Sequence, residues 1–151
     1  MFQPIYQPRG RAQEYCDMAI IIYDSCPHGC TYCYARGMAA RFGKPWGTIT
    51  RPRPGIVEAT QKQLSASKWQ GAGKKIMLCF MCDPYPIGFD TMATREVIRA
   101  IKESGNHVQI LTKGDETAQR DFDLLDGNDS FYQENGISTD NIVALGMVYQ
   151  F

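Results

Sequence analysis

The stretch Ile76-Met77-Leu78-Cys79-Phe80-Met81 is apolar from end to end, and the turn sequence Asp83-Pro84-Tyr85-Pro86 follows it after one residue. An uninterrupted apolar run of this length is typical of a strand that is covered on both faces, as in parallel sheets. We therefore expect a buried strand over residues 75–82. The rest of the fold can be worked out in both directions from it.

Three more segments have strand character: residues 17–23, with three consecutive isoleucines, residues 108–112, and residues 141–151. Between the strands, apolar residues recur at helical spacing over residues 32–42, residues 56–64 and around residues 118–125. Another helix is expected to begin after Asp90 or Thr91 and to stop at Gly105. This alternation of strands and helices predicts an α/β fold with a parallel sheet.

The length of the chain limits how far such a sheet can extend. A complete eight-unit β/α barrel needs about 250 residues, and this chain has 151. We therefore predict a partial parallel barrel of about four βα units, formed by residues 17–151. Residues 1–16 are expected to be an N-terminal arm without a core of its own. The open edge would need cover, which a partner chain completing the barrel could supply.

Composition places the chain among soluble globular proteins, with 44% hydrophobic and 21% charged residues. It contains no apolar stretch of transmembrane length and no signal-peptide pattern, so we expect a cytoplasmic protein with no membrane partner. The six cysteines include a tight cluster and a pair within the apolar run. That distribution favours metal ligation in a reducing compartment over disulfides.

The cysteine cluster is the strongest chemical signal in the chain. Cys26, Cys30 and Cys33 form a C-x3-C-x2-C motif directly after the first expected strand. Three thiolates can hold a cubane iron–sulfur cluster and leave one iron without a protein ligand. The alternative is a zinc site completed by His28 or Cys82, although the spacing is not one that zinc sites commonly use. His28 could serve as a fifth ligand or as a supporting hydrogen-bond donor, but we expect a solvent-facing loop histidine.

Polar residues follow the expected strands where each one ends. In α/β folds the carboxyl ends of parallel strands build the active site. The cysteine loop, Asp83 and Lys113 are therefore expected to meet at one rim. We expect Cys79 to be a small buried residue of the strand. For Cys82, at the end of the strand, a structural role and a cofactor-binding role both remain open. Asp83 could contact a cofactor at this rim, or it could hold the following turn through an Asx-type hydrogen bond.

Charge is unevenly distributed along a chain whose formal net charge is zero. Residues 31–57 contain five basic residues and no acid, and they also carry several aromatic side chains, whereas residues 115–140 contain eight acids and one arginine. A basic and aromatic mixture can bind nucleic acid, but a dedicated DNA-binding protein usually has a larger basic excess. We favour a solvated face beside an anionic cofactor.

Taken together, these motifs resemble those of radical S-adenosylmethionine (SAM) enzymes. The cysteine motif with an aromatic residue before its last cysteine is similar to their signature. Its continuation Cys33-Tyr34-Ala35-Arg36, with Cys82-Asp83-Pro84-Tyr85 and Leu111-Thr112-Lys113, resembles the branch that contains spore photoproduct lyase and proteins described as DNA repair photolyases. The resemblance runs from about residue 16 to residue 126, and residues 130–151 are not placed by it.

The resemblance implies a lyase-like enzyme that binds a [4Fe–4S] cluster and SAM. Cys26, Cys30 and Cys33 would ligate three irons, and the amino and carboxylate groups of SAM would chelate the fourth. Reductive cleavage of SAM would then give a 5′-deoxyadenosyl radical that abstracts hydrogen from a substrate. It also implies an electron donor of the flavodoxin or ferredoxin kind. Nucleic acid is a substrate class suggested by analogy alone.

Individual cofactor contacts carry over by position. Tyr32 matches the aromatic residue near the adenine, Lys113 matches a lysine that pairs with the SAM carboxylate, and Asp83 is shared with the family. Cys82 stands where the lyase has a serine that contacts SAM, which makes it the candidate catalytic residue. The lyase's hydrogen-donating cysteine would fall on Met81 or Phe80, so thymine-dimer repair is not implied. A second hypothesis, a truncated iron–sulfur or zinc-binding module without catalysis, stays open.

Overall fold

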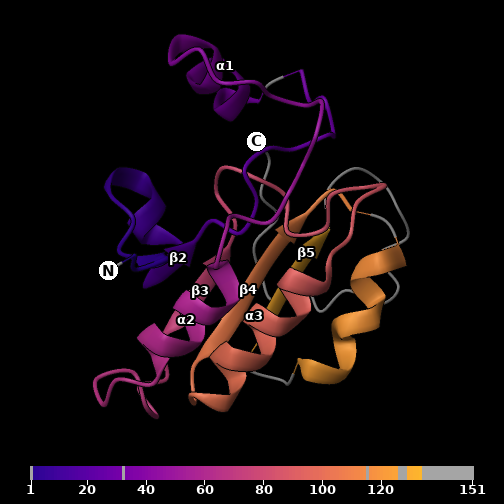
Figure 1. The fold of residues 1–151 in the computed structure, drawn as a ribbon. Coiled ribbons are helices and arrows are strands. Elements are labelled where there is room, and N and C mark those ends of the chain that lie inside the picture. The colour runs from indigo at the N-terminus through magenta and orange to yellow at the C-terminus, as the bar shows by residue number, and fades with distance from the viewer. Residues whose placement is uncertain (1, 32, 115, 126–128, 134–151) are drawn as a thin grey trace.

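A computed structural model describes residues 2–31, 33–114, 116–125 and 129–133 (Figure 1). At its centre is a five-stranded sheet in the order β1-β2-β3-β4-β5. The strands are β1 (Ile5–Tyr6), β2 (Met18–Ile20), β3 (Lys75–Leu78), β4 (His107–Thr112) and β5 (Ser130–Gln133). Strands β2 to β5 are parallel and β1 is antiparallel to β2. The predicted α/β class is confirmed, and the sheet formed by the described residues is open.

The helices are α1 (Tyr34–Arg41), α2 (Ile56–Leu64) and α3 (Met92–Glu103), with two 3-10 helices, η1 (Gly10–Glu14) and η2 (Glu116–Leu124). In Figure 1, α2, α3 and η2 lie along the same face of the sheet, whereas α1 stands apart beyond the carboxyl ends of the strands. The expected helices at residues 56–64 and after Thr91 are confirmed. The helix expected at residues 118–125 is present as η2, in 3-10 geometry.

The main core lies between the sheet and these helices. Strand β3 supplies Ile76 and Leu78, which are fully buried, and α3 supplies Val97, Ile98 and Ile101 from one stripe of its surface. Burying one such aliphatic side chain stabilises the fold by about 1.5–3 kcal/mol. A smaller cluster of Cys16, Ala19 and Met77 occupies the opposite face of the sheet. Strand β3 is therefore buried on both faces, as its uninterrupted apolar sequence predicted.

Helix α3 begins and ends at the signals expected from the sequence. The Asp90 carboxylate accepts a hydrogen bond from the Met92 amide at 2.9 Å, which satisfies a free N–H of the first turn. Gly105 follows the helix with φ of 78°. A Cβ atom on Gly105 would lie 2.8 Å from the Cα atom of Gly71, so the close approach of the two loops also requires glycine.

Two strands are shorter than expected. The predicted strand at residues 17–23 stops pairing with β3 at Ile20, because the chain beyond it bonds elsewhere: the Arg53 amide donates to the Ile22 carbonyl at 2.8 Å, and the Asp24 amide donates to the Arg51 carbonyl at 3.0 Å. The strand predicted at residues 75–82 ends at Leu78. Residues 79–82 form a loop instead, and this loop borders the site described below.

The N-terminal arm docks onto the sheet rather than standing free. Ile5 is buried in the main core, and the Gln63 side chain of α2 bonds both its amide and its carbonyl at 2.8 Å. The arm adds β1 and η1, which the sequence analysis did not anticipate. Strand β5 takes the fourth parallel position. The strand expected at residues 141–151 lies outside the described residues.

Candidate metal and cofactor site

The loops that follow β2, β3 and β4 converge on one cavity at the carboxyl edge of the sheet. Six of the seven predicted site residues border it: Cys26, Cys30, Cys33, Cys82, Asp83 and Lys113. The seventh, Tyr32, lies outside the described residues. The enclosed space is about 170 Å³, below the roughly 300–1,000 Å³ of pockets for drug-sized ligands. The cavity therefore has room for a small inorganic group or for part of an organic cofactor, and the remainder would lie at the open rim.

The cysteine loop is folded so that its last member begins a helix. The Cys33 amide donates to the Cys30 carbonyl at 3.2 Å. Cys33 is also the N-cap of α1, and its Sγ atom accepts a hydrogen bond from the Arg36 amide at 3.4 Å. The Cys33 sulfur therefore lies at the amino end of α1, where backbone N–H groups of the first turn are available as donors.

All six cysteines are free thiols in the structure. Burial raises the pKa of the Cys26 thiol to about 11. A metal bound there would replace this proton, because thiolate is the ligating form. Among the described residues, no three potential ligands are grouped closely enough to hold a metal ion. Three sulfur donors bordering one cavity nevertheless match, in number and in type, the donor set of a cubane with an open iron.

Asp83 joins the loops that surround the cavity. Its carboxylate accepts hydrogen bonds from the Tyr85 amide at 2.8 Å, from the Lys113 amide at 2.6 Å and from the Thr112 hydroxyl. Burial raises the pKa of the Asp83 carboxyl, while nearby His28 and these three donors act in the opposite direction. The Tyr85 contact is the Asx-type bond left open by the sequence. Because both carboxylate oxygens already have protein donors, Asp83 is placed to hold the β3 and β4 loops together.

His28 also belongs to this junction, and the expectation of a solvent-facing side chain is wrong. Its side chain is only 4% exposed, and Nδ1 lies 3.3 Å from Oδ2 of Asp83. Nε2 accepts a hydrogen bond from the Ile87 amide at 3.1 Å, so the neutral ring carries its proton on Nδ1, toward the carboxylate. The ring packs inward because it joins the cysteine loop to the loop after β3. A lone loop histidine in sequence does not reveal such a partner.

Cys79 and Cys82 lie side by side below the cysteine loop. Both are buried and both border the cavity. Burial is the main cause that raises the pKa of the Cys79 thiol, and the neighbouring Cys82 raises it further. Cys79 is therefore a buried residue next to the strand, as expected. Cys82 lies at the cavity, where the predicted contact with SAM would require it.

Two aromatic residues at the cavity were not assigned a role from the sequence. The Tyr34 hydroxyl donates to the Phe80 carbonyl at 2.7 Å and so connects α1 with the loop after β3. Trp46 also borders the cavity. The Gly47 amide bonds the buried Ser25 hydroxyl at 2.7 Å, which holds this part of the 43–54 loop against the cysteine loop. The position of Tyr34 directly after Cys33 was a usable signal; nothing in the sequence marked the Trp46 contact.

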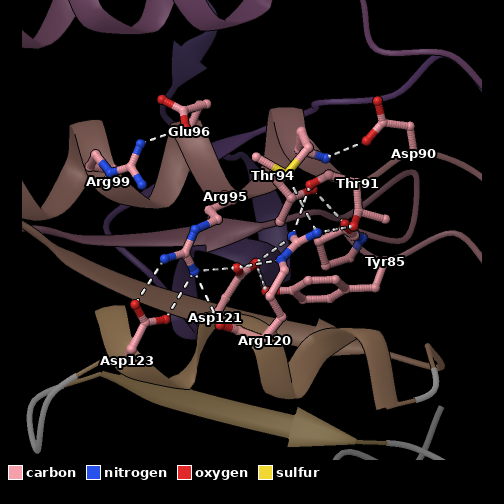
Figure 2. A network of polar contacts seen from close by, with 12 residues as sticks. Tyr85, Asp90, Thr91, Thr94, Arg95, Glu96, Arg99, Arg120, Asp121 and Asp123 are labelled. Carbon is pink, nitrogen blue, oxygen red and sulfur yellow. Dashed lines mark hydrogen bonds and ion pairs between the residues drawn. The ribbon is translucent and has the colours of Figure 1, made fainter.

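A buried polar network supports the site from below (Figure 2). The Asp121 carboxylate of η2 is 0% exposed and accepts a hydrogen bond from the Tyr85 hydroxyl at 2.8 Å. Figure 2 shows this carboxylate between the guanidinium groups of Arg95 and Arg120, each bonded to it at 2.9 Å. Tyr85 is the residue whose amide bonds Asp83, so the network fixes the turn that holds the β3 and β4 loops.

Close packing completes this support. A Cβ atom on Gly114 would lie 2.6 Å from Cβ of Tyr85, so only glycine allows the turn after β4 to approach Tyr85 this closely. On the other side, the Thr94 hydroxyl donates to the Pro84 carbonyl at 2.5 Å and shares a 2.8 Å hydrogen bond with the Tyr23 hydroxyl. The turn after β3 is therefore held by α3, η2 and the segment that follows β2.

Comparison with known proteins adds little to this geometry. No family model matches the chain, and no solved structure matches it. Thirty residues, 20% of the chain, are similar to parts of three porins: outer membrane porin N of Escherichia coli (strain K12), 76% identical, and outer membrane proteins S2 and S1 of Salmonella typhi, 72% and 62% identical. Each match covers 8% of the porin, so the chain spans less than a tenth of the curated relatives that it matches. None of the described helices has the length and hydropathy needed to cross a bilayer.

Proposed function

We propose that this chain is the cofactor-binding part of a radical SAM enzyme of the lyase-like branch. The observation that carries the proposal is the convergence of three free cysteines with Cys82, Asp83 and Lys113 at one cavity. These residues come from three separate loops, 26–33, 79–83 and 113. Their convergence is independent of the spacing that first drew attention to the cysteines.

The architecture supports the same proposal. Strands β2 to β5 follow one another in order along the sheet, and in the part of the chain that the structure describes α2, α3 and η2 lie on one face of it (Figure 1). A β/α barrel places its helices on the outside of a sequentially ordered parallel sheet, whereas a doubly wound fold covers both faces. We interpret the open sheet as a segment of a barrel.

Within this proposal, the residues of the chain bind and orient the cofactors. Cys26, Cys30 and Cys33 hold the cluster, and the Lys113 side chain pairs with the carboxylate of SAM. When bound, the reduced cluster supplies the electron that cleaves SAM and gives a carbon radical able to take hydrogen from a substrate. Asp83 holds the loops after β3 and β4 together. Cys82 and its apolar neighbours limit the access of water to the cavity from the side of the sheet.

Reduction of the cluster requires a small electron-carrier protein, and we place this chemistry in the cytoplasm, where thiols stay reduced. The substrate is open, and nucleic acid is the class to test first. The small enclosed volume supports a second candidate function, a non-catalytic iron–sulfur module that acts with a partner chain completing the barrel.

The deciding experiment is anaerobic reconstitution with iron and sulfide, followed by dithionite and SAM. We expect a brown protein that releases 5′-deoxyadenosine. A stable cluster without cleavage of SAM would support the non-catalytic module. A colourless protein that binds one zinc ion would remove both interpretations.

A further inference from the structure

A second cavity lies at the amino edge of the sheet, opposite the edge that carries the candidate metal and cofactor site. It forms where the N-terminal arm meets the starts of β2 and β3 and the loop after α2, and Figure 1 shows this loop at the end of the sheet away from α1. The volume is about 590 Å³, within the roughly 300–1,000 Å³ of pockets that bind small organic ligands. We call it the amino-edge cavity. The residues that border it include Gln7, Gln13, Asp17, Lys68, Trp69 and Lys74.

Hydrogen bonds hold the walls of the amino-edge cavity in place. The buried Asn106 side chain donates to the Trp69 carbonyl at 2.8 Å and accepts from the Lys74 amide at 3.0 Å. The Asp17 carboxylate accepts from the Lys75 amide at 2.9 Å, and the Asp17 amide donates to the Lys75 carbonyl at 3.1 Å. The loop after α2 and the starts of β2 and β3 are therefore fixed without a ligand. A site that is already formed costs less ordering when a ligand binds.

Positively charged and donor groups outnumber their acceptors at this cavity. The Lys68 and Lys74 ammonium groups lie 5.9 Å and 5.3 Å from the centroid of the Trp69 ring. Among the residues that the structure describes, neither ammonium group forms an ion pair, and the buried indole N–H of Trp69 has no hydrogen-bond partner. Asp17 is the one acid among the described residues that border the cavity, and one of its oxygens already accepts from the Lys75 amide. The group that this set of donors lacks is an anion.

We propose that the amino-edge cavity binds a small organic phosphate, of the size of a sugar phosphate or a nucleoside monophosphate. Lys68 and Lys74 bind the phosphate group. A lysine ammonium acts as a point charge on a flexible stem, which suits a tetrahedral dianion, whereas a planar carboxylate is matched best by the fork of an arginine. The cavity is larger than a phosphate ion, and the amide side chains of Gln7 and Gln13 can bond hydroxyl groups of the organic part. The inference goes beyond the proposed function, since the two cavities share no bordering residue.

Three other kinds of ligand match the cavity less well. A metal cation would be repelled by two ammonium groups and would meet a single carboxylate. A neutral hydroxylated molecule would leave both lysines without a counter-charge. Nucleic acid needs a larger basic surface, and the chain as a whole has no net positive charge.

The test is isothermal titration calorimetry of the full chain with four probes: ribose 5-phosphate, inorganic phosphate, ribose and citrate. We expect both phosphates to bind, ribose 5-phosphate more tightly than inorganic phosphate, and ribose not to bind. Absence of saturable binding by either phosphate overturns the proposal. Ribose binding as tightly as ribose 5-phosphate, or citrate binding more tightly than it, also overturns the assignment to a phosphate.

A double variant places the binding at this cavity. Lys68→Gln/Lys74→Gln removes both charges and should weaken binding of ribose 5-phosphate at least about tenfold, because hydrogen bonds to charged groups are the strong ones. The matched control, Lys44→Gln/Lys62→Gln, makes the same change in net charge at exposed positions that do not border the cavity. It should bind like the unmodified protein. Equal affinity of the two double variants would show that the phosphate binds elsewhere.

Asp17→Asn provides a test by gain of affinity, which misfolding cannot imitate. Asparagine keeps an acceptor for the Lys75 amide but removes the negative charge beside the proposed phosphate. Inorganic phosphate should therefore bind about threefold more tightly to this variant, because a like charge no longer opposes it. Unchanged or weaker binding of inorganic phosphate would contradict the proposed position of the anion.

Discussion

The two sides of the candidate site are built differently. On the side formed by the turn after β3, Asp83 and Tyr85 are buried and are held by hydrogen bonds from β4, α3 and η2. On the cysteine side, the three proposed ligands are only partly buried and α1 stands apart from the core (Figure 1). His28 and Tyr34 make side-chain hydrogen bonds that cross between the two sides.

This difference indicates where a bound cluster would matter to the fold. The Asp83 side is complete without it, because its buried polar groups have protein partners. On the cysteine side, three thiols border a common cavity and are only partly buried. A cluster bridging three cysteines would link residues 26–33 at several points and so add to the stability of this loop.

The largest expected effect comes from removing a proposed ligand on the cysteine side. Cys33→Ala should abolish retention of iron and cleavage of SAM, because a cubane held by two thiolates is exposed to loss. Iron content and absorbance after anaerobic reconstitution measure this directly. Cys16→Ala is the control, since Cys16 lies in the small core cluster away from the cavity and should leave iron content unchanged. Equal iron in Cys33→Ala and the unmodified protein would show that Cys33 is not a ligand.

Removing a central group of the supported side should affect stability first. Asp121→Ala leaves the buried Tyr85 hydroxyl without its carboxylate acceptor and removes one ion pair from each of two arginines, and should lower the free energy of unfolding by about 3 kcal/mol. Urea denaturation of the iron-free protein checks the value. A change below about 0.5 kcal/mol, the usual range for surface substitutions, would show that the network does not stabilise this side.

The next largest effect is expected for Lys113→Ala, which tests the proposed pairing of the lysine side chain with the carboxylate of SAM. Loss of a hydrogen bond to a charged group should weaken SAM binding about 10–100-fold while the absorbance of the cluster is unchanged. Equilibrium dialysis of labelled SAM against the reconstituted variant gives the affinity. If SAM affinity and cluster absorbance fall together, the lysine has a structural role instead.

The smallest effects come from a matched pair of tyrosine substitutions. Tyr85→Phe removes a buried hydroxyl bonded to a carboxylate and should lower the free energy of unfolding by about 1.5 kcal/mol. Tyr34→Phe removes a hydroxyl at an exposed position and should leave global stability within about 0.5 kcal/mol. Amide hydrogen exchange should nevertheless accelerate in α1 of Tyr34→Phe. Equal losses of stability in the two variants would contradict the contrast between the two sides.

Much of the fold followed from local pattern. Strand β3 and helix α3 could be predicted from their apolar run and apolar stripe, because burial restricts the residue types at many of their positions. Strand β1 could not be predicted, because two residues carry no periodicity and Ile5 is placed by its contact with Gln63. The length of β2 also depended on a distant partner, the loop at residues 51–53.

Candidate site residues that form a spacing motif could be identified from the sequence. Residues placed there by packing against distant parts of the chain could not. The cysteine motif and the positions of Asp83 and Lys113 after strands predicted that these residues meet at one edge of the sheet, and they border one cavity there. The inward orientation of His28 depends on a carboxylate 55 residues away in sequence, and the support of Tyr85 by Asp121 depends on the placement of η2. Such long-range polar contacts leave no local signature.

The most direct test of the account is Mössbauer spectroscopy of oxygen-protected protein reconstituted with ⁵⁷Fe, recorded before and after SAM is added. The account predicts a cubane signal in which one of four irons is distinct and shifts when SAM binds, because Cys26, Cys30 and Cys33 leave that iron without a protein ligand. Four equivalent irons that do not respond to SAM, or no iron–sulfur signal, would contradict it.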